Sequence, residues 1–165
     1  MSSIDKINQL SINDFISIFR NVFEKTDWIA KKAYKFKPFS SFEDLSEKFL
    51  YIFKNETKEN HLKILNAHPD LAVEKIMTND SKKEQNNAQL NKCSQKEFEE
   101  FLKLNIEYRK KFNFPYIIAV SGKTKKEILE SFRERTKKDI NTEFEQAKKQ
   151  VIKIASLRIN QIKNL

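Results

Sequence analysis

The stretch 94–112, SQKEFEEFLKLNIEYRKKF, decides the fold class of this chain. It begins with Ser94-Gln95-Lys96-Glu97, a capping box in which the serine and glutamate side chains each accept a hydrogen bond from the other's backbone N–H. The side chains that follow recur every three or four residues, which is the spacing of one helix face. That face carries Phe98, Phe101, Leu102, Asn105, Tyr108 and Phe112. The stretch therefore predicts one long helix.

The same helical spacing extends over the rest of the chain. Further helices are predicted to begin near Asp27, Phe42, Lys58, Ser81 and Asn141. A capping-box-like start at Ser11 and a second capping box at Thr124-Lys125-Lys126-Glu127 predict two more. One Gly and three Pro leave little material for β-hairpin turns. The apolar run 116–120 is typical of a strand, but a lone strand has no partner, so we expect extended chain there. We predict an all-α fold, a single-domain bundle of about seven to eight helices over residues 1–165.

The composition indicates one soluble domain. A chain of 165 residues, 39% hydrophobic and with 14 Phe, is long enough to bury a core. No apolar run approaches the roughly 18 residues of a membrane span, and the N-terminus lacks the pattern of a signal peptide. We therefore expect a cytoplasmic protein with no membrane partner. The single cysteine, Cys93, excludes an intrachain disulfide and a multi-cysteine metal site, and we interpret it as an ordinary thiol.

The net charge of +9 invites a nucleic-acid interpretation. The lysines are, however, scattered among acidic residues, as in Lys96-Glu97-Phe98-Glu99-Glu100. A nucleic-acid site would instead collect basic residues in one block with aromatic side chains for stacking. We therefore expect no nucleic-acid partner.

The stretch Ala67-His68-Pro69-Asp70-Leu71-Ala72 contains the more informative of the two histidines. Pro69 lacks an N–H and restricts its predecessor to extended geometry, so the preceding helix is expected to end here. An imidazole at such a break is expected to be exposed and held in place, and a histidine that merely caps the helix is the alternative. His61 lies in mid-helix near charged neighbours, and we interpret it as a surface residue.

Ser81, Glu84 and Gln85 have the i, i+3, i+4 spacing that places them on one helix face. Beside an imidazole, they would form a polar pocket able to move a proton. Alternatively, Ser81 caps the helix and Glu84 completes a capping box, and a helix start can also attract an anion. Arg158 falls on the apolar stripe of the last helix. A guanidinium that points inward must pair with an acid, such as Glu84, or bind a ligand anion.

Taken in order, these segments resemble the 2-oxo-4-hydroxy-4-carboxy-5-ureidoimidazoline (OHCU) decarboxylase family nearly end to end. The resemblance lies in Thr26-Asp27-Trp28-Ile29-Ala30, Lys37-Pro38-Phe39, the stretch 67–72, Ser81-Lys82-Lys83-Glu84-Gln85, Leu104-Asn105, Tyr108, Lys111-Phe112, Phe114-Pro115, Ile117-Ile118-Ala119-Val120, Ile128-Leu129 and Ile154-Ala155-Ser156-Leu157-Arg158. The chain departs from the family where Val73, Gln89 and Asn113 stand in place of glycines, and its segment 68–81 is shorter.

The resemblance implies decarboxylation of OHCU to (S)-allantoin in urate degradation, without a metal or another cofactor. In this substrate, a ring C=N one bond from the carboxylate-bearing carbon accepts the electron pair released with CO2. The resemblance makes His68 the acid/base and proton donor, and Glu84 the residue that orients it. It also implies a homodimer. The substrate-binding residues it implies are Pro69, Ser81, Lys82, Lys83, Glu84, Gln85, the backbone of Tyr116, Ile117, Ile118, Ala119 and Val120, and Arg158.

Two hypotheses from other classes stay open. His68-Pro69-Asp70 after a lysine-containing helix is also similar to the J-domain of chaperone partners. That module continues with a basic residue, whereas Leu71 and Ala72 follow here. The second hypothesis is a helical interaction module without catalytic activity.

Overall fold

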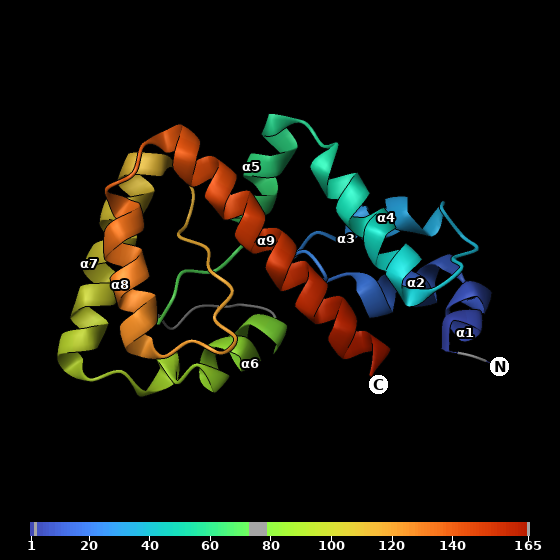
Figure 1. The fold of residues 1–165 in the computed structure, drawn as a ribbon, viewed down its shortest axis with the longest axis horizontal. Coiled ribbons are helices and arrows are strands. Elements are labelled where there is room, and N and C mark those ends of the chain that lie inside the picture. The colour runs from blue at the N-terminus through green and yellow to red at the C-terminus, as the bar shows by residue number, and fades with distance from the viewer. Residues whose placement is uncertain (2, 73–78, 165) are drawn as a thin grey trace. The chain divides into compact units, whose positions relative to one another are not determined.

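The computed structural model describes residues 1, 3–72 and 79–164, and the regular elements within these residues are all helical (Figure 1). The all-α prediction is therefore confirmed. These residues form nine α-helices and one 3-10 helix, and the additional α-helix is α1 (Ser3–Gln9), which the sequence analysis missed. None of the helices in the described residues is long and apolar enough to cross a membrane. The chain forms two compact units, residues 1–64 with 152–165, and residues 65–151.

The first unit has an aromatic core. It is built from α1, α2 (Ile12–Phe19), α3 (Asp27–Tyr34), α4 (Phe42–Lys54), most of α5 (Lys58–Asn66) and the C-terminal part of α9 (Ile140–Lys163). Ser11 and Ser41 begin α2 and α4 as expected of N-caps, because each side chain accepts a backbone N–H three residues further on. The rings of Phe15 and Phe19 lie 4.6 Å apart, and Phe19 lies 5.6 Å from Phe49. Phenylalanines spaced along α2 and α4 thus join the two helices.

The second unit carries most of the predicted site residues. It contains α6 (Asn79–Asn87), the 3-10 helix η1 (Leu90–Lys92), α7 (Gln95–Phe112), α8 (Lys125–Thr136) and the first part of α9. Figure 1 shows α7 and α8 side by side. Both begin with the complete capping boxes that the sequence predicts, at Ser94 and Thr124. The segment 116–120, which follows α7 and precedes α8 along the chain, is buried and has no regular secondary structure, as expected.

Two positions at which the resemblance predicts glycine adopt left-handed backbone. Asn113 ends α7 with φ +62°, and its N–H donates to the carbonyl of Arg109 at 2.8 Å. Gln89 precedes η1 with φ +61°. Left-handed backbone crowds a Cβ atom, and asparagine tolerates it better than most residues. Val73, the third replaced glycine, lies outside the described residues.

Candidate active site

His68 and Pro69 lie at the break that follows α5, and both are buried. The backbone N–H of His68 donates to the carbonyl of Leu65 at 3.2 Å, which closes the last turn before Pro69 stops the helix. The expectation of an exposed imidazole is wrong, because His68 is 5% exposed. The break therefore holds the imidazole within the second unit.

A side chain from α6 fastens the backbone that follows Pro69. Gln85 uses both ends of its amide: Nε2 donates to the carbonyl of Asp70 at 3.2 Å, and Oε1 accepts from the N–H of Ala72 at 3.1 Å. Ala72 itself has left-handed backbone, with φ +56°. The amide thus bridges the two sides of a sharp bend in the chain.

Two side chains from α7 fasten the same segment from another helix. Asn105 Nδ2 donates to the carbonyl of Leu71 at 3.0 Å, and Arg109 Nε donates to Asp70 Oδ1 at 2.8 Å. Asn105 is 4% exposed. Residues 70–72 are therefore held at three consecutive positions by side chains of α6 and α7.

The inner face of α6 matches the predicted polar face. Ser81 and Gln85 are buried and Glu84 is partly buried, whereas Lys82 and Lys83 are exposed. Ser81 is the third residue of α6, so the alternative in which it forms the N-cap is wrong. On this face, Gln85 forms hydrogen bonds that reach the segment after His68.

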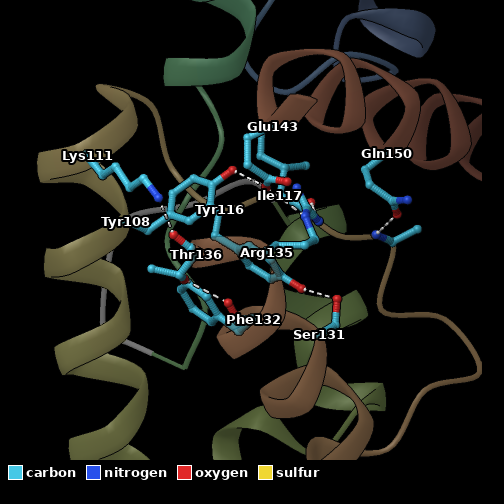
Figure 2. Close-up of polar contacts among 11 residues, drawn as sticks. Tyr108, Lys111, Tyr116, Ile117, Ser131, Phe132, Arg135, Thr136, Glu143 and Gln150 are labelled. Atoms are coloured by element: carbon cyan, nitrogen blue, oxygen red, sulfur yellow. Dashed lines mark hydrogen bonds and ion pairs between the residues drawn. The ribbon is translucent and has the colours of Figure 1, made fainter. Parts of the chain in front are cut away.

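The extended segment 116–120 is anchored through its backbone, as Figure 2 shows. The carbonyl of Ile117 accepts from Arg135 Nη1 on α8 at 2.6 Å. The N–H of Ala119 donates to Gln150 Oε1 on α9 at 3.0 Å. Two helices thus fix the direction of a chain segment that forms no helix or strand of its own.

A buried charge cluster supports this anchor. Arg135 Nε donates to Glu143 Oε1 at 2.8 Å, and the Tyr108 hydroxyl donates to the same oxygen at 2.6 Å (Figure 2). The guanidinium also lies over the ring of Tyr116, 4.4 Å from its centroid. Burial, and secondly the hydrogen bond to Glu143, raises the pKa of the Tyr108 phenol well above its ordinary value. Tyr108 therefore remains a neutral hydrogen-bond donor.

Arg158 lies in the first unit and is paired with an acid there. Its Nη2 donates to Glu24 Oε2 at 3.0 Å, and its Nη1 donates to the carbonyl of Asn21 at 2.8 Å. Arg158 is 2% exposed, so the prediction of an inward guanidinium is confirmed. The acid is Glu24, which the sequence analysis did not identify.

For His61 the structure contradicts the expectation, whereas for Cys93 it agrees with the expectation. His61 is buried, and its Nε2 lies 2.6 Å from the carbonyl oxygen of Phe53, so the surface interpretation is wrong. Cys93 is partly buried, and its Sγ donates to the carbonyl of Leu90 at 3.2 Å. Burial raises the pKa of the Cys93 thiol, which disfavours the reactive thiolate. Cys93 is thus an ordinary thiol, as expected.

Three of the side chains that hold the site segments, Arg135, Glu143 and Asn105, were not among the predicted site residues. A signal for them exists, and it is the same one that identified Arg158: a polar residue on the apolar stripe of a helix. Arg135 follows Phe132 by three residues on α8, and Glu143 precedes Ala147 by four on α9. Asn105 interrupts the apolar face of α7 in the same way.

Comparisons with known proteins agree on one family. The model of the OHCU decarboxylase family matches residues 8–160. The uric acid degradation bifunctional protein PucL of Bacillus subtilis is 39% identical over 98% of this chain, which spans only 33% of that relative. The OHCU decarboxylase of Haloferax volcanii is 32% identical, over 95% of this chain and 94% of the relative. A crystal structure of an OHCU decarboxylase in the presence of (S)-allantoin has a TM-score of 0.74 at 25% identity, covering 88% of this chain and 96% of that one.

Proposed function

Because the chain belongs to the OHCU decarboxylase family, we propose that it decarboxylates OHCU to (S)-allantoin, with His68 as the acid/base and proton donor. The observation that carries the proposal is the family match over residues 8–160. The local geometry supports it, because the chain buries His68 at a helix break and holds the following residues with Gln85.

The chemistry needs a proton acceptor and a proton donor at neighbouring atoms. The bond between the ring and the carboxylate breaks and CO2 leaves, while its electron pair forms a C=C bond and the former C=N nitrogen takes up a proton from water. The hydroxyl then loses its proton and becomes a carbonyl, and the ureido-bearing carbon gains one. We assign these last two transfers to the His68 imidazole, since histidine both accepts and donates protons near neutral pH. A proton delivered to one face produces one enantiomer of allantoin.

Residues of α6 provide the other proposed contacts. Glu84 orients His68 and favours its charged form, because a nearby anion stabilises an imidazolium. Ser81 and Gln85 bind the ureido and ring amides. An amide has two N–H groups and two oxygen lone pairs, so Gln85 can hold residues 70–72 and still contact substrate. Lys82 and Lys83 stay in the proposal through the resemblance alone, since both are exposed.

The remaining proposed contacts come from Pro69 and the segment 116–120. Pro69 forms one wall of the pocket, and the backbone groups of 116–120 hydrogen-bond the polar ring. Arg135 and Gln150 fix the direction of this segment by holding the Ile117 carbonyl and the Ala119 N–H, so the proposed contacts to substrate fall mainly to its other backbone groups. Substrate contact by Arg158 stays a prediction, because its guanidinium is occupied by Glu24 in the structure. A homodimer and a cytoplasmic location also stay predictions.

The decisive experiment follows the optical activity of allantoin formed from freshly generated OHCU. We expect the wild type to give one enantiomer even in the presence of a chelator. We expect His68→Ala to lose at least ~100-fold in kcat, as for removal of a general acid/base, with little change in Tm. The matched control is the other buried histidine, His61→Ala, which should lower Tm and leave kcat nearly unchanged. Racemic product at the uncatalysed rate from the wild type would refute the proposed function.

Glu84→Gln tests the proposed partner of His68, because it preserves shape and removes charge. If the reaction requires the charged imidazole, the basic limb of the pH–rate profile should move to lower pH. An unchanged profile would remove Glu84 from the mechanism and leave His68 with its role.

The J-domain hypothesis makes a different prediction. It requires the protein to stimulate ATP hydrolysis by an Hsp70-type chaperone, and it requires Asp70→Asn to abolish the stimulation. We expect no stimulation, because the chain matches the decarboxylase family over 8–160 and Arg109 occupies the Asp70 carboxylate. Stimulation that disappears in Asp70→Asn would favour the J-domain hypothesis.

A further inference from the structure

Asp70 belongs to the stretch 67–72 that contains His68, yet the proposed chemistry gives Asp70 no role. Its carboxylate accepts from Arg109 Nε at 2.8 Å, and its backbone carbonyl accepts from Gln85 at 3.2 Å. The side chains of Arg109 and Asp70 are 34% and 20% exposed. Water screens an ion pair at such exposure, so the pair adds little to the global stability of the fold. Its effect is therefore expected to be local.

We propose that Arg109 is a positioning residue that fixes the orientation of the His68 imidazole through Asp70. The inference rests on the proposed role of His68 as proton donor. It adds to that role a residue on α7 that does not touch substrate.

The backbone between the two residues is short and stiff, which is why a hold at Asp70 reaches His68. Pro69 stands between them, and its ring locks φ near −65°. His68 is tied on its other side by the hydrogen bond from its N–H to the carbonyl of Leu65. With both ends held, the Cα–Cβ bond from which the imidazole projects has a fixed place and direction, and burial of the ring, which is 5% exposed, limits its two side-chain torsions. Without the Arg109 contact, the Asp70 end loses its side-chain anchor.

A rigid support lies behind this contact. Arg109 and Asn105 are one turn apart on α7, a helix of 18 residues, and they bond consecutive residues of the segment. Asn105 holds the carbonyl of Leu71, so the segment keeps its general course when Arg109 is changed. The substitution Arg109→Gln should therefore alter the angle of His68 and not unfold the segment.

The first test compares Arg109→Gln with a matched control on a neighbouring helix. Arg133 on α8 forms an ion pair with Glu100 on α7 at similar exposure, and it is not among the residues that hold 70–72. We expect Arg109→Gln to lower kcat about tenfold, since small misplacements of a reacting group are costly, with KM changed less than about twofold. Arg109→Lys preserves the charge and should recover most of kcat. Arg133→Gln should leave kcat unchanged, and both Gln variants should have similar Tm values.

The second test does not depend on turnover. The chain contains two histidines, so 15N spectra of labelled imidazoles resolve His68 with His61 as an internal reference. Arg109→Gln should shift or broaden the ring signals of His68 and leave those of His61 unchanged. Arg133→Gln should change neither set.

The outcomes separate this inference from the proposed function. If the wild type does not convert OHCU, the proposed function fails, and the ring signals alone decide whether Arg109 positions His68. If His68 signals and kcat respond equally to Arg109→Gln and Arg133→Gln, the positioning role is wrong. The same holds if Arg109→Gln loses activity only in proportion to a loss of folded protein.

Discussion

Removing one hydroxyl from the buried cluster of the second unit, by Tyr108→Phe, should lower the free energy of unfolding by about 2 kcal/mol. In the wild type the phenol donates to Glu143 Oε1 at 2.6 Å, and Arg135 binds the same oxygen at 2.8 Å. Tyr108 is fully buried and Glu143 is 1% exposed, so bulk water cannot replace the lost donor.

The magnitude follows from what the substitution preserves. The Tyr108 ring packs against the rings of Phe112, Phe114, Tyr116 and Phe132, at centroid distances of 4.5, 5.9, 5.5 and 5.9 Å. Phenylalanine retains these contacts, so the loss is one hydrogen bond to a charged acceptor, about 1.5–3 kcal/mol. In a chain of this length, a loss of about 2 kcal/mol lowers Tm by about 4–8 °C.

Urea denaturation followed by far-ultraviolet circular dichroism measures this change. The control is Tyr51→Phe, because Tyr51 is 57% exposed and its substitution should leave the unfolding free energy unchanged. A loss in Tyr108→Phe that is no larger than in the control would refute the reasoning.

The difference in unfolding free energy between wild type and Tyr108→Phe should also depend on pH. Burial raises the pKa of Tyr108, so the folded state keeps the phenol proton that the unfolded chain loses above about pH 10. This contribution is fully present below the unfolded pKa and is lost as pH rises above it, by up to about 1.4 kcal/mol per pH unit. The stability advantage of wild type over Tyr108→Phe should therefore shrink above pH 10. An advantage that stays constant or grows there would contradict the assignment.

Two further sets of substitutions test the same physics. Glu143→Gln should cost about 3–5 kcal/mol in urea denaturation, because it leaves the buried guanidinium of Arg135 without its counter-charge; Glu145→Gln, at an exposed site on the same helix, should cost almost nothing. Gln89→Gly should raise Tm by relieving left-handed backbone, a gain of about 0.5–1 kcal/mol, and Asn113→Gly should gain less. Equal gains at both positions would show that side-chain type does not matter there.

Local signals in the sequence predicted the helices well. The capping boxes at Ser94 and Thr124, the N-cap at Ser11 and the stop at Pro69 all depend on residues within a few positions of one another. Such interactions can be predicted from the sequence, because they depend only on the spacing of residues along the chain. The helix α1 was missed because residues 3–9 offer little apolar periodicity, and Ile7 is the buried residue it contributes.

The sequence predicted burial for some side chains of the candidate site, but it did not predict their hydrogen-bond partners. The helical spacing of Ser81 and Gln85 correctly predicted that both turn to one buried face. It could not predict that Gln85 bonds the backbone of residues 70–72, because that pairing joins separate segments. Arg158 shows the same limit, since its stripe position indicated a buried guanidinium and its partner Glu24 is 134 residues away.

The departures from the family pattern divide by location. Gln89 and Asn113, which stand where the resemblance predicts glycine, lie next to η1 and α7, where the backbone is left-handed. A side chain with a Cβ atom at these positions lowers the free energy of unfolding, because left-handed backbone crowds that atom. Gln85 and Asn105, by contrast, bond the backbone of residues 70–72 directly. Substitutions at the two left-handed positions should therefore act on stability, whereas substitutions of the two amides should act on the backbone beside His68.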